Sequence, residues 1–445
     1  MLFRSTLIPN LWQDNFLTAA IPFVFAPSIF AQPGEPIAFQ NTFVPLSLPT
    51  AYDIEGQPIF RTGRTEDVPP NTVMDLVRFQ NDLNALAPGN VQLLNITGIA
   101  KNFRNGYIGS WVAGVDHDFG DFKFNASYVA TTGIHLPRVY NPNGYGGACH
   151  GFAPFTQFSS PCHAVAGFGP EIIMTSGSHS SYHALQTSLT KNSARFGLGV
   201  QASYTYAKSL DDTSAVLAGL LGSSGTLLQT APQNPWDPSA EKGPSTFDVT
   251  HVFAASVIQV VPLDRIAFLR PLGRTLTRGR QVLNITTLTT GSPFTVFSGV
   301  QQTGAGLGGG DRPDLISMPH LSTSRAVRAD YFGLGAAGNQ SFFYIPTNIP
   351  GGTGPNQGRF GTLGRNTFRG PAYHDFDFAI IKDTPFGHRG NAELATLEFR
   401  AEFFNMFNLV NFGLPSNIVS GSGFGVISKT AGTSRQIQFS LKVIY

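Results

Sequence analysis

The stretch from Leu397 to Phe403 reads LEFRAEF, and every second residue in it is charged. Glu398, Arg400 and Glu402 alternate without exception with Leu, Phe, Ala and Phe, so an extended strand would gather the charges on one face. A charged face this dense needs water. In a transmembrane barrel it would line a polar lumen, while the apolar face would meet lipid. A solvated outer face over the core of a soluble β-sandwich is the alternative that this stretch leaves open.

The last residues of the sequence repeat this alternation. The apolar residues of the repeat are Ile437, Phe439, Leu441, Val443 and Tyr445; polar residues separate them, and Ile444 is the exception. A barrel in hydrocarbon must close, because each unpaired backbone group at an open edge costs several kcal/mol. We therefore expect these residues to form the strand that closes the barrel.

The same period of two extends back along the chain to about residue 105. Phe122 to Ala130 alternates, and Gly120-Asp121 joins it to Tyr107 to Phe119, which predicts a hairpin. The other predicted strands are Tyr182 to Lys191, Phe196 to Lys208, Phe247 to Val261, Gln281 to Thr290, Phe294 to Phe297, Tyr373 to Lys382, Leu394 to Phe404, Phe424 to Lys429 and Ser434 to Tyr445. The sequence thus predicts an all-β fold, with about ten strands of an antiparallel transmembrane β-barrel.

The connections between these strands alternate in length. Those at 137–180, 209–246 and 298–370 are long and rich in Gly, Ser, Pro and Asn, whereas 120–121 and 192–195 are short. Short turns at one end and long loops at the other are typical of outer-membrane barrels. The prediction is therefore a partial barrel with long loops, located in the cell outer membrane.

The composition favours strands over helices. Gly (49) and Pro (31) are abundant among the 445 residues, and Phe (38) far outnumbers Met (5). Only 13% of the residues are charged, against about 25% in ordinary soluble domains. The net charge of +2 is not concentrated in any long basic run, so nothing indicates nucleic acid as a partner.

Residues 1–100 form a separate, loop-rich segment in this interpretation, and residues 101–445 form the barrel portion. One short helix is expected at Thr72 to Leu86, after a pair of prolines. The apolar stretch Leu17 to Ala31 contains two prolines and is too short for a spanning helix of about 20 residues. Whether this stretch is a signal peptide or a loop is left open.

Seven ordered blocks of the sequence resemble the Oar-like TonB-dependent receptors, which are large outer-membrane barrels. They are SYVATTGIHLPR (Ser127 to Arg138), SYTYAKSLDDTS (Ser203 to Ser214), EKGPSTFDVTHVF (Glu241 to Phe253), GSPFTVFSG (Gly291 to Gly299), DRPDL (Asp311 to Leu315), LEFRAEFFNMFNLVNFG (Leu397 to Gly413) and GTSRQIQFSLKVIY (Gly432 to Tyr445). The resemblance implies uptake of a bulky nutrient, such as an oligosaccharide or a peptide.

The same resemblance implies a plug domain and a segment that engages the energy transducer TonB, and neither is recognised in this sequence. Transporters of this architecture close with about 22 strands, so the chain resembles the C-terminal half of a barrel. The expected partners are outer-membrane lipid, a separately encoded plug and N-terminal barrel half, and the TonB system. The alternatives are a plugless structural or adhesive envelope protein and a non-functional gene fragment.

Two groups of polar residues are candidate functional features. Cys149 and Cys162 lie in the long loop at 137–180, where a disulfide would close the loop. Each cysteine precedes a histidine, so a zinc site is one alternative, and free thiols are the other. Glu398, Arg400, Glu402 and Lys382 are the charges expected to face the lumen and tune the passage of polar solutes.

No enzyme activity, cofactor or metal is expected. Ser180 and His183 in the segment GSHSSYH leave open an envelope hydrolase, although no third orienting group is indicated. The carboxylate pairs Asp211-Asp212 and Asp375 with Asp377 are interpreted as solvated loop acids and lumen-facing strand residues, respectively, with binding of calcium or of a cationic ligand as the alternative.

Overall fold

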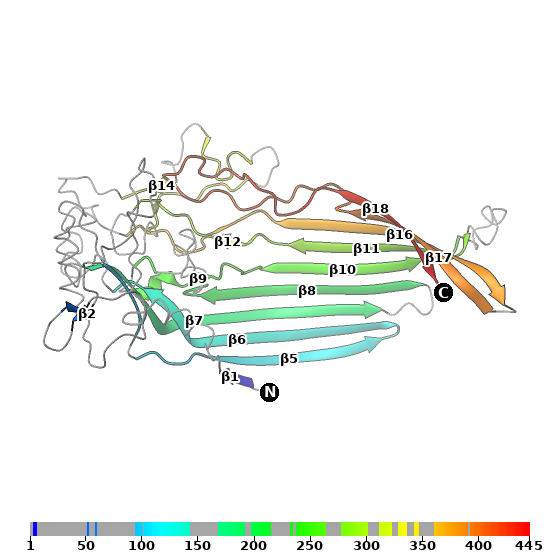
Figure 1. Cartoon of the computed structure of the whole chain (residues 1–445), viewed down its shortest axis with the longest axis horizontal. Helices are drawn as coiled ribbons and strands as arrows, with labels where there is room; N and C mark the ends of the chain where they lie inside the picture. Colours follow the sequence, from blue (N-terminus) through cyan, green and yellow to red (C-terminus); the bar gives the residue numbers. More distant parts are fainter. Residues whose placement is uncertain are drawn as a thin grey trace.

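The computed structural model describes residues 3–6, 51–52, 58–59, 94–100, 102–142, 168–191, 197–214, 232–234, 237–263, 277–300, 311–322, 328–335, 342–346, 360–389 and 392–445. Its main element is a 12-stranded sheet, shown in Figure 1. The strands that lie side by side, in this order, are β1 (Phe3–Thr6), β5 (Tyr107–Phe119), β6 (Phe122–Tyr140), β7 (Phe168–Lys191), β8 (Leu198–Asp211), β10 (His251–Val260), β11 (Arg280–Thr289), β16 (Tyr373–Arg389), β17 (Ala392–Phe404) and β18 (Gln436–Ile444). All these neighbours pair antiparallel.

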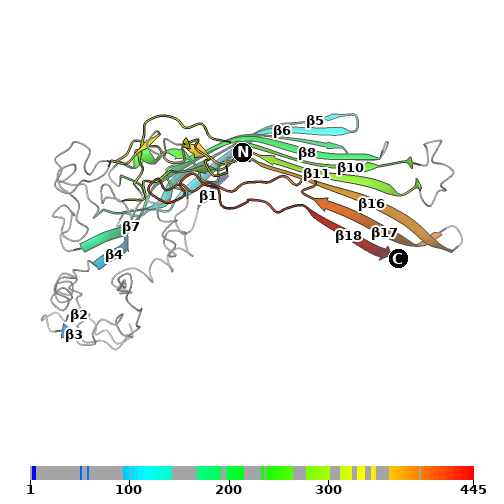
Figure 2. The same cartoon turned by 90° about the horizontal axis from the view of Figure 1, so that it is seen from above.

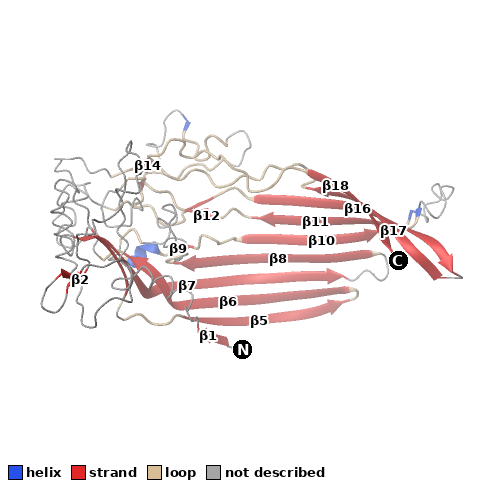
Figure 3. Cartoon of the chain, viewed as in Figure 1, coloured by secondary structure: helices blue, strands red, loops and turns tan. Residues whose placement is uncertain are grey.

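The shorter strands lie beside this sheet or among the loops (Figure 3). β4 (Leu94–Ile99) pairs in parallel with β7, and β9 (Gly243–Pro244) pairs with β8. Three two-stranded sheets join β2 (Ala51–Tyr52) to β3 (Pro58–Ile59), β12 (Pro293–Phe294) to β15 (Phe368–Arg369), and β13 (Asp314–Leu315) to β14 (Phe343–Tyr344). A 3-10 turn, η3, spans Pro238–Glu241. Among the described residues, no helix has the length and apolarity needed to cross a membrane.

Most of the strands lie close to the predicted positions, but β7 begins at Phe168, within the predicted long connection at 137–180. The predicted strand from Phe294 to Phe297 is reduced to β12, which pairs with β15 outside the main sheet. β5 has the predicted bounds, and Gly120-Asp121 forms the turn to β6. Gly120 has a φ of 61°, a backbone conformation that glycine adopts without a steric penalty. One predicted strand is wrong: the segment from Phe424 to Lys429 forms turns and loop, because Phe424 and Ile427 are buried in a hydrophobic cluster instead of joining the sheet. The predicted helix, and most of the segment 1–100, lie outside the described residues.

The register gives the sheet one polar and one apolar face. Directly paired residues of neighbouring strands share a face, and the side chains along each strand alternate between faces. Phe403 of β17 pairs with Phe378 of β16 and with Ile437 of β18, whereas Glu402 pairs with Ala379 and Gln438. We call the side of Phe403 the apolar face and the side of Glu402 the polar face.

Amphipathic side chains mark the apolar face near the long loops. The Tyr128 hydroxyl lies 2.7 Å from His183 Nδ1, and the Tyr204 hydroxyl lies 2.8 Å from His251 Nδ1. Near the short turns, Lys191 Nζ lies 4.8 Å from the centre of the Phe122 ring. Aromatic girdles of this kind flank an apolar band about 25 Å tall in transmembrane barrels.

The long connections meet at one end of the sheet (Figures 1 and 2), where they form a hydrophobic core. The Phe332 ring stacks on Phe424 at 4.8 Å and contacts the rings of Phe343 and Phe368 edge-on, each at 5.5 Å. Fully burying one such side chain stabilises a fold by about 1.5 to 3 kcal/mol. We call the described residues within 232–249, 291–300, 311–346, 360–370 and 411–430 the loop layer.

The described sheet is not closed. β1 lies at one edge and β18 at the other, and β18 pairs with β17 alone. In hydrocarbon, the unpaired N–H and C=O groups of such edges would be costly. A sheet with one polar face, one apolar face and its long loops at one end has the architecture of a barrel wall, as the sequence predicted.

Candidate functional site

The polar face of β17 carries an ion-paired cluster. Arg400 Nε lies 3.1 Å from Glu398 Oε1, and Arg400 Nη1 lies 3.4 Å from Glu402 Oε1. The side chains are 37%, 19% and 22% exposed, respectively, so water screens the pairs and each contributes little to stability. The alternating pattern of LEFRAEF thus brings all three charges onto one face, beside Ser440 and Lys442 of β18.

Lys382 does not belong to this cluster, which corrects the prediction that it shares their face. It pairs with Phe399 and with Arg280, so it lies on the apolar face. Its Nζ donates a hydrogen bond of 2.7 Å to the backbone oxygen of Asp383. The pattern misled because Lys382 occupies the apolar phase of β16 close to the sheet's short-turn end, where long cationic side chains reach the water.

The apolar residues of β18 share one face, as predicted. The residues of β18 that lie on this face and pair with residues of β17 are Ile437, Phe439, Leu441 and Val443. Phe439 and Leu441 are each 67% exposed, and Tyr445 follows the strand fully exposed. An apolar row with this exposure suits contact with lipid. That β18 closes the barrel stays a prediction.

Three ion pairs whose carboxylates are buried hold the loop layer together. Arg312 donates to both carboxylate oxygens of Glu241, at 2.6 and 2.8 Å. Arg365 pairs with Asp211, and Arg369 pairs with Asp248. The side chains of Glu241, Asp211 and Asp248 are at most 3% exposed. Charges removed from water to this extent are stable only when paired and hydrogen-bonded.

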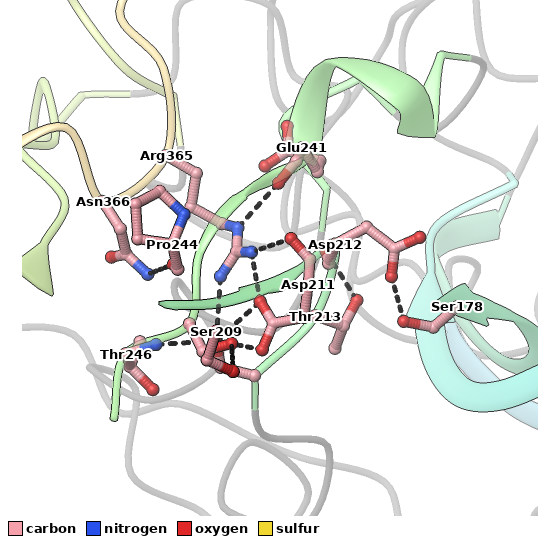
Figure 4. A network of polar contacts seen from close by, with 12 residues as sticks. Ser178, Ser209, Asp211, Asp212, Thr213, Glu241, Pro244, Thr246, Arg365 and Asn366 are labelled. Atoms are coloured by element: carbon pink, nitrogen blue, oxygen red, sulfur yellow. Dashed lines mark hydrogen bonds and ion pairs between the residues drawn. The ribbon is translucent and has the colours of Figure 1, made fainter. Parts of the chain in front are cut away.

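Arg365 is at the centre of this network, as Figure 4 shows. Its Nε donates to the Glu241 backbone oxygen at 2.8 Å, and its Nη1 donates to the Ser214 hydroxyl at 2.9 Å. The neighbouring Asn366 donates to the Pro244 backbone oxygen at 2.7 Å. One arginine therefore joins the end of β8, the turn before β9 and the loop before β15.

The network overturns the interpretation of Asp211 as a solvated acid, because Asp211 is only 4% exposed. Asp212 accepts hydrogen bonds from the backbone N–H of His179, at 3.0 and 3.1 Å, and from the Ser178 hydroxyl. Sequence reasoning missed these roles, although a signal was present. Asp211, Glu241, Asp248 and Arg312 all lie in the blocks that carry the family resemblance.

Other candidate residues are not brought together. Ser180 pairs with Asp211 on the polar face, whereas His183 contacts Tyr128 on the apolar face, so these two side chains cannot act on one substrate. Within the described part of the chain, no group of three or more His, Cys, Asp or Glu side chains could hold a metal ion. Cys149 and Cys162 lie outside the described residues.

The comparison with protein-family models agrees with this architecture. A family model described as an outer membrane beta barrel domain matches residues 29–438. The outer membrane transporter YddB from Escherichia coli is similar in structure with a TM-score of 0.38 and 9% sequence identity, over 80% of this chain and 34% of that one. The chain thus spans about a third of that transporter's length. No curated protein sequence matches.

Proposed function

The chain belongs to the family of outer membrane beta barrel domains, and from that premise we propose that it forms part of the wall of a TonB-dependent transporter. It is an outer-membrane protein, and its apolar face contacts lipid. The transported solute would be a bulky nutrient. Its passage would depend on binding and release, with no covalent chemistry.

The polar face of β16 to β18 is the observation that carries this proposal. Glu398, Arg400 and Glu402 are partly exposed and pair with one another on the side opposite Phe399. Such charges are tolerated at membrane depth only where they line a water-filled space. A polar lumen bounded by this face would admit hydrophilic solutes.

The resemblance to Oar-like receptors supports TonB dependence. In that arrangement, strands other than those described pair with the edges at β1 and β18 and complete the barrel. A plug domain gates the lumen, and a segment attached to the plug engages TonB. We assign both to sequence outside residues 101–445.

A growth experiment in the native host tests this function. The gene is deleted, TonB is depleted in a separate strain, and both strains are grown on a panel of oligosaccharides and peptides as sole carbon sources. We expect deletion to abolish growth on at least one nutrient, and TonB depletion to abolish growth on the same one. Growth of the deletion strain on every nutrient would contradict the proposal.

The loop layer favours one other function, a structural or adhesive role in the envelope. Its own hydrophobic cluster and ion pairs would present a rigid surface outside the cell. In the same pair of strains, this role predicts normal growth on all nutrients but reduced attachment of the deletion strain to surfaces. TonB depletion would leave attachment unchanged.

A further inference from the structure

Two grooves open on the polar face at the ends of the strands that adjoin the loop layer. The first, of about 280 Å³, lies over β7, β8 and β10 and is lined by Tyr182, Gln186, Thr205 and Phe247 among others. The second, of about 370 Å³, lies over β16, β17 and β18 and is lined by Tyr373, Asp375, Asp377, Phe404, Gln436 and Gln438 among others. Neither groove was anticipated from the sequence.

One row of paired residues connects the grooves. Gln186 of the first groove pairs with Thr205, Thr205 with Val252, Val252 with Thr289, and Thr289 with Tyr373 of the second groove. All five side chains therefore share the polar face at one level of the sheet. Val252 and Tyr373 are separated by two strand spacings, about 10 Å. A single elongated ligand can span both grooves along this row.

Each groove combines exposed aromatic rings with planar hydrogen-bonding groups. Phe247 is 63% exposed and Phe404 is 37% exposed, so their apolar surface is available to a ligand. Asp377 uses one carboxylate oxygen to accept the backbone N–H of Asn405 at 2.9 Å. Its second oxygen and the exposed amides of Gln436 and Gln438 can bind further groups.

We propose that the two grooves form one binding site for a neutral oligosaccharide. A sugar ring has an apolar C–H face, which packs on an aromatic ring, and vicinal hydroxyls, which donate to carboxylates and exchange hydrogen bonds with amides. Asp375 and Asp377 disfavour anionic ligands. Beneath the grooves, β7, β8, β10, β16 and β17 are paired on both sides within the sheet, and the proposed function pairs the outer edge of β18 with a further barrel strand, so no free edge is left for a peptide to extend. The inference rests on the proposed function, because the site must face an aqueous lumen.

Calorimetry on the complete detergent-purified barrel tests the inference. The probes are maltotetraose, cellotetraose, xylotetraose and laminaritetraose, with the matching disaccharides, tetra-alanine and calcium chloride as comparisons. We expect at least one tetrasaccharide to bind at least tenfold more tightly than its disaccharide, because only the longer ligand reaches both grooves. Failure of every tetrasaccharide to bind, or tighter binding of the peptide or of calcium, would overturn the inference.

Variants locate the site. Phe247→Ala and Phe404→Ala should each weaken tetrasaccharide binding at least tenfold. Phe399→Ala is the matched control, since Phe399 is also on β17 and 42% exposed but lies on the apolar face; it should bind normally. Gln186→Ala and Gln438→Ala each remove a carboxamide and one methylene while leaving the aromatic rings in place, and they should also weaken tetrasaccharide binding. Equal binding by all these variants would overturn the assignment of the grooves.

The outcome separates this inference from the proposed function. Tetrasaccharide binding without any TonB-dependent growth would support the binding site and contradict the proposed transport function. TonB-dependent growth on a peptide, with no tetrasaccharide bound, would contradict the oligosaccharide site and support the proposed transport function.

Discussion

Replacing Arg312 with methionine should open the loop layer while the sheet stays assembled. The Arg312 guanidinium donates to Glu241 at 2.6 and 2.8 Å and to the Leu363 backbone oxygen at 2.8 Å. The Arg312 and Glu241 side chains are 5% and 2% exposed. Removing one partner of such a pair costs about 3 to 5 kcal/mol, because the other charge is left buried and uncompensated.

The assay is proteolysis of intact cells by added protease, with heat-modifiable gel migration as the readout of barrel assembly. When opening and closing are fast, the cleavage rate follows the open population, so it should rise roughly 10²- to 5 × 10³-fold. Arg400→Met is the control. Arg400 is 37% exposed, so its loss should cost less than about 1 kcal/mol and leave the cleavage rate nearly unchanged.

A double variant separates charge from packing. In Arg312→Met with Glu241→Gln, the uncompensated carboxylate is gone, so much of the lost resistance to protease should return. An Arg312→Met protein that is cleaved at the wild-type rate would refute the reasoning, because the loop layer would then not depend on this ion pair.

Four further outcomes are expected. Phe399→Arg places a charge against lipid and should weaken heat-resistant assembly by roughly 2 to 4 kcal/mol; unchanged migration would argue against a lipid face. In Gly291→Ala, the new Cβ would lie 1.8 Å from the Gly370 backbone oxygen, so protease resistance of the loops should fall, and wild-type resistance would contradict this close approach. Burial raises the pKa of Tyr331 from 10.0 to about 12, so the contribution of Tyr331 to the stability of the loop layer should be complete below pH 10 and be lost as the pH rises towards 12; Tyr331→Phe should lessen this loss, as protease resistance across this pH range would show. Reduction should shift the gel mobility of the exported protein, and Cys149→Ser should remove that shift; no shift in the wild type would leave the disulfide unsupported.

Local patterns predicted the sheet well. The alternation from Tyr107 to Phe119 gave β5 its full length, and Gly120-Asp121 gave its turn. This was possible because the side-chain period of a strand and the conformational freedom of glycine are properties of neighbouring residues. The same reasoning failed at Phe424 to Lys429, where Phe424 and Ile427, three residues apart, enter a cluster built by distant loops.

The candidate site was predicted only in part, because contacts between residues far apart in the chain also determine it. Alternation placed Glu398, Arg400 and Glu402 on one face. Lys382 is in phase with Phe378 and Ile380 of β16, and the register between β16 and β17 showed that this phase lies on the opposite, apolar face. Asp211 resembled a solvated loop acid until Arg365, 154 positions away, was found beside it.

The sequence by itself determined where the chain is extended and that its strands have one wet and one apolar side. The tertiary structure decided which charges are buried in the loop layer, which residues share a face, and that two grooves lie on one row of the sheet. Strand pairing and loop contacts join residues that are far apart in the chain. The entropic cost of closing the chain between two such residues, and how deeply each becomes buried, depend on the whole fold.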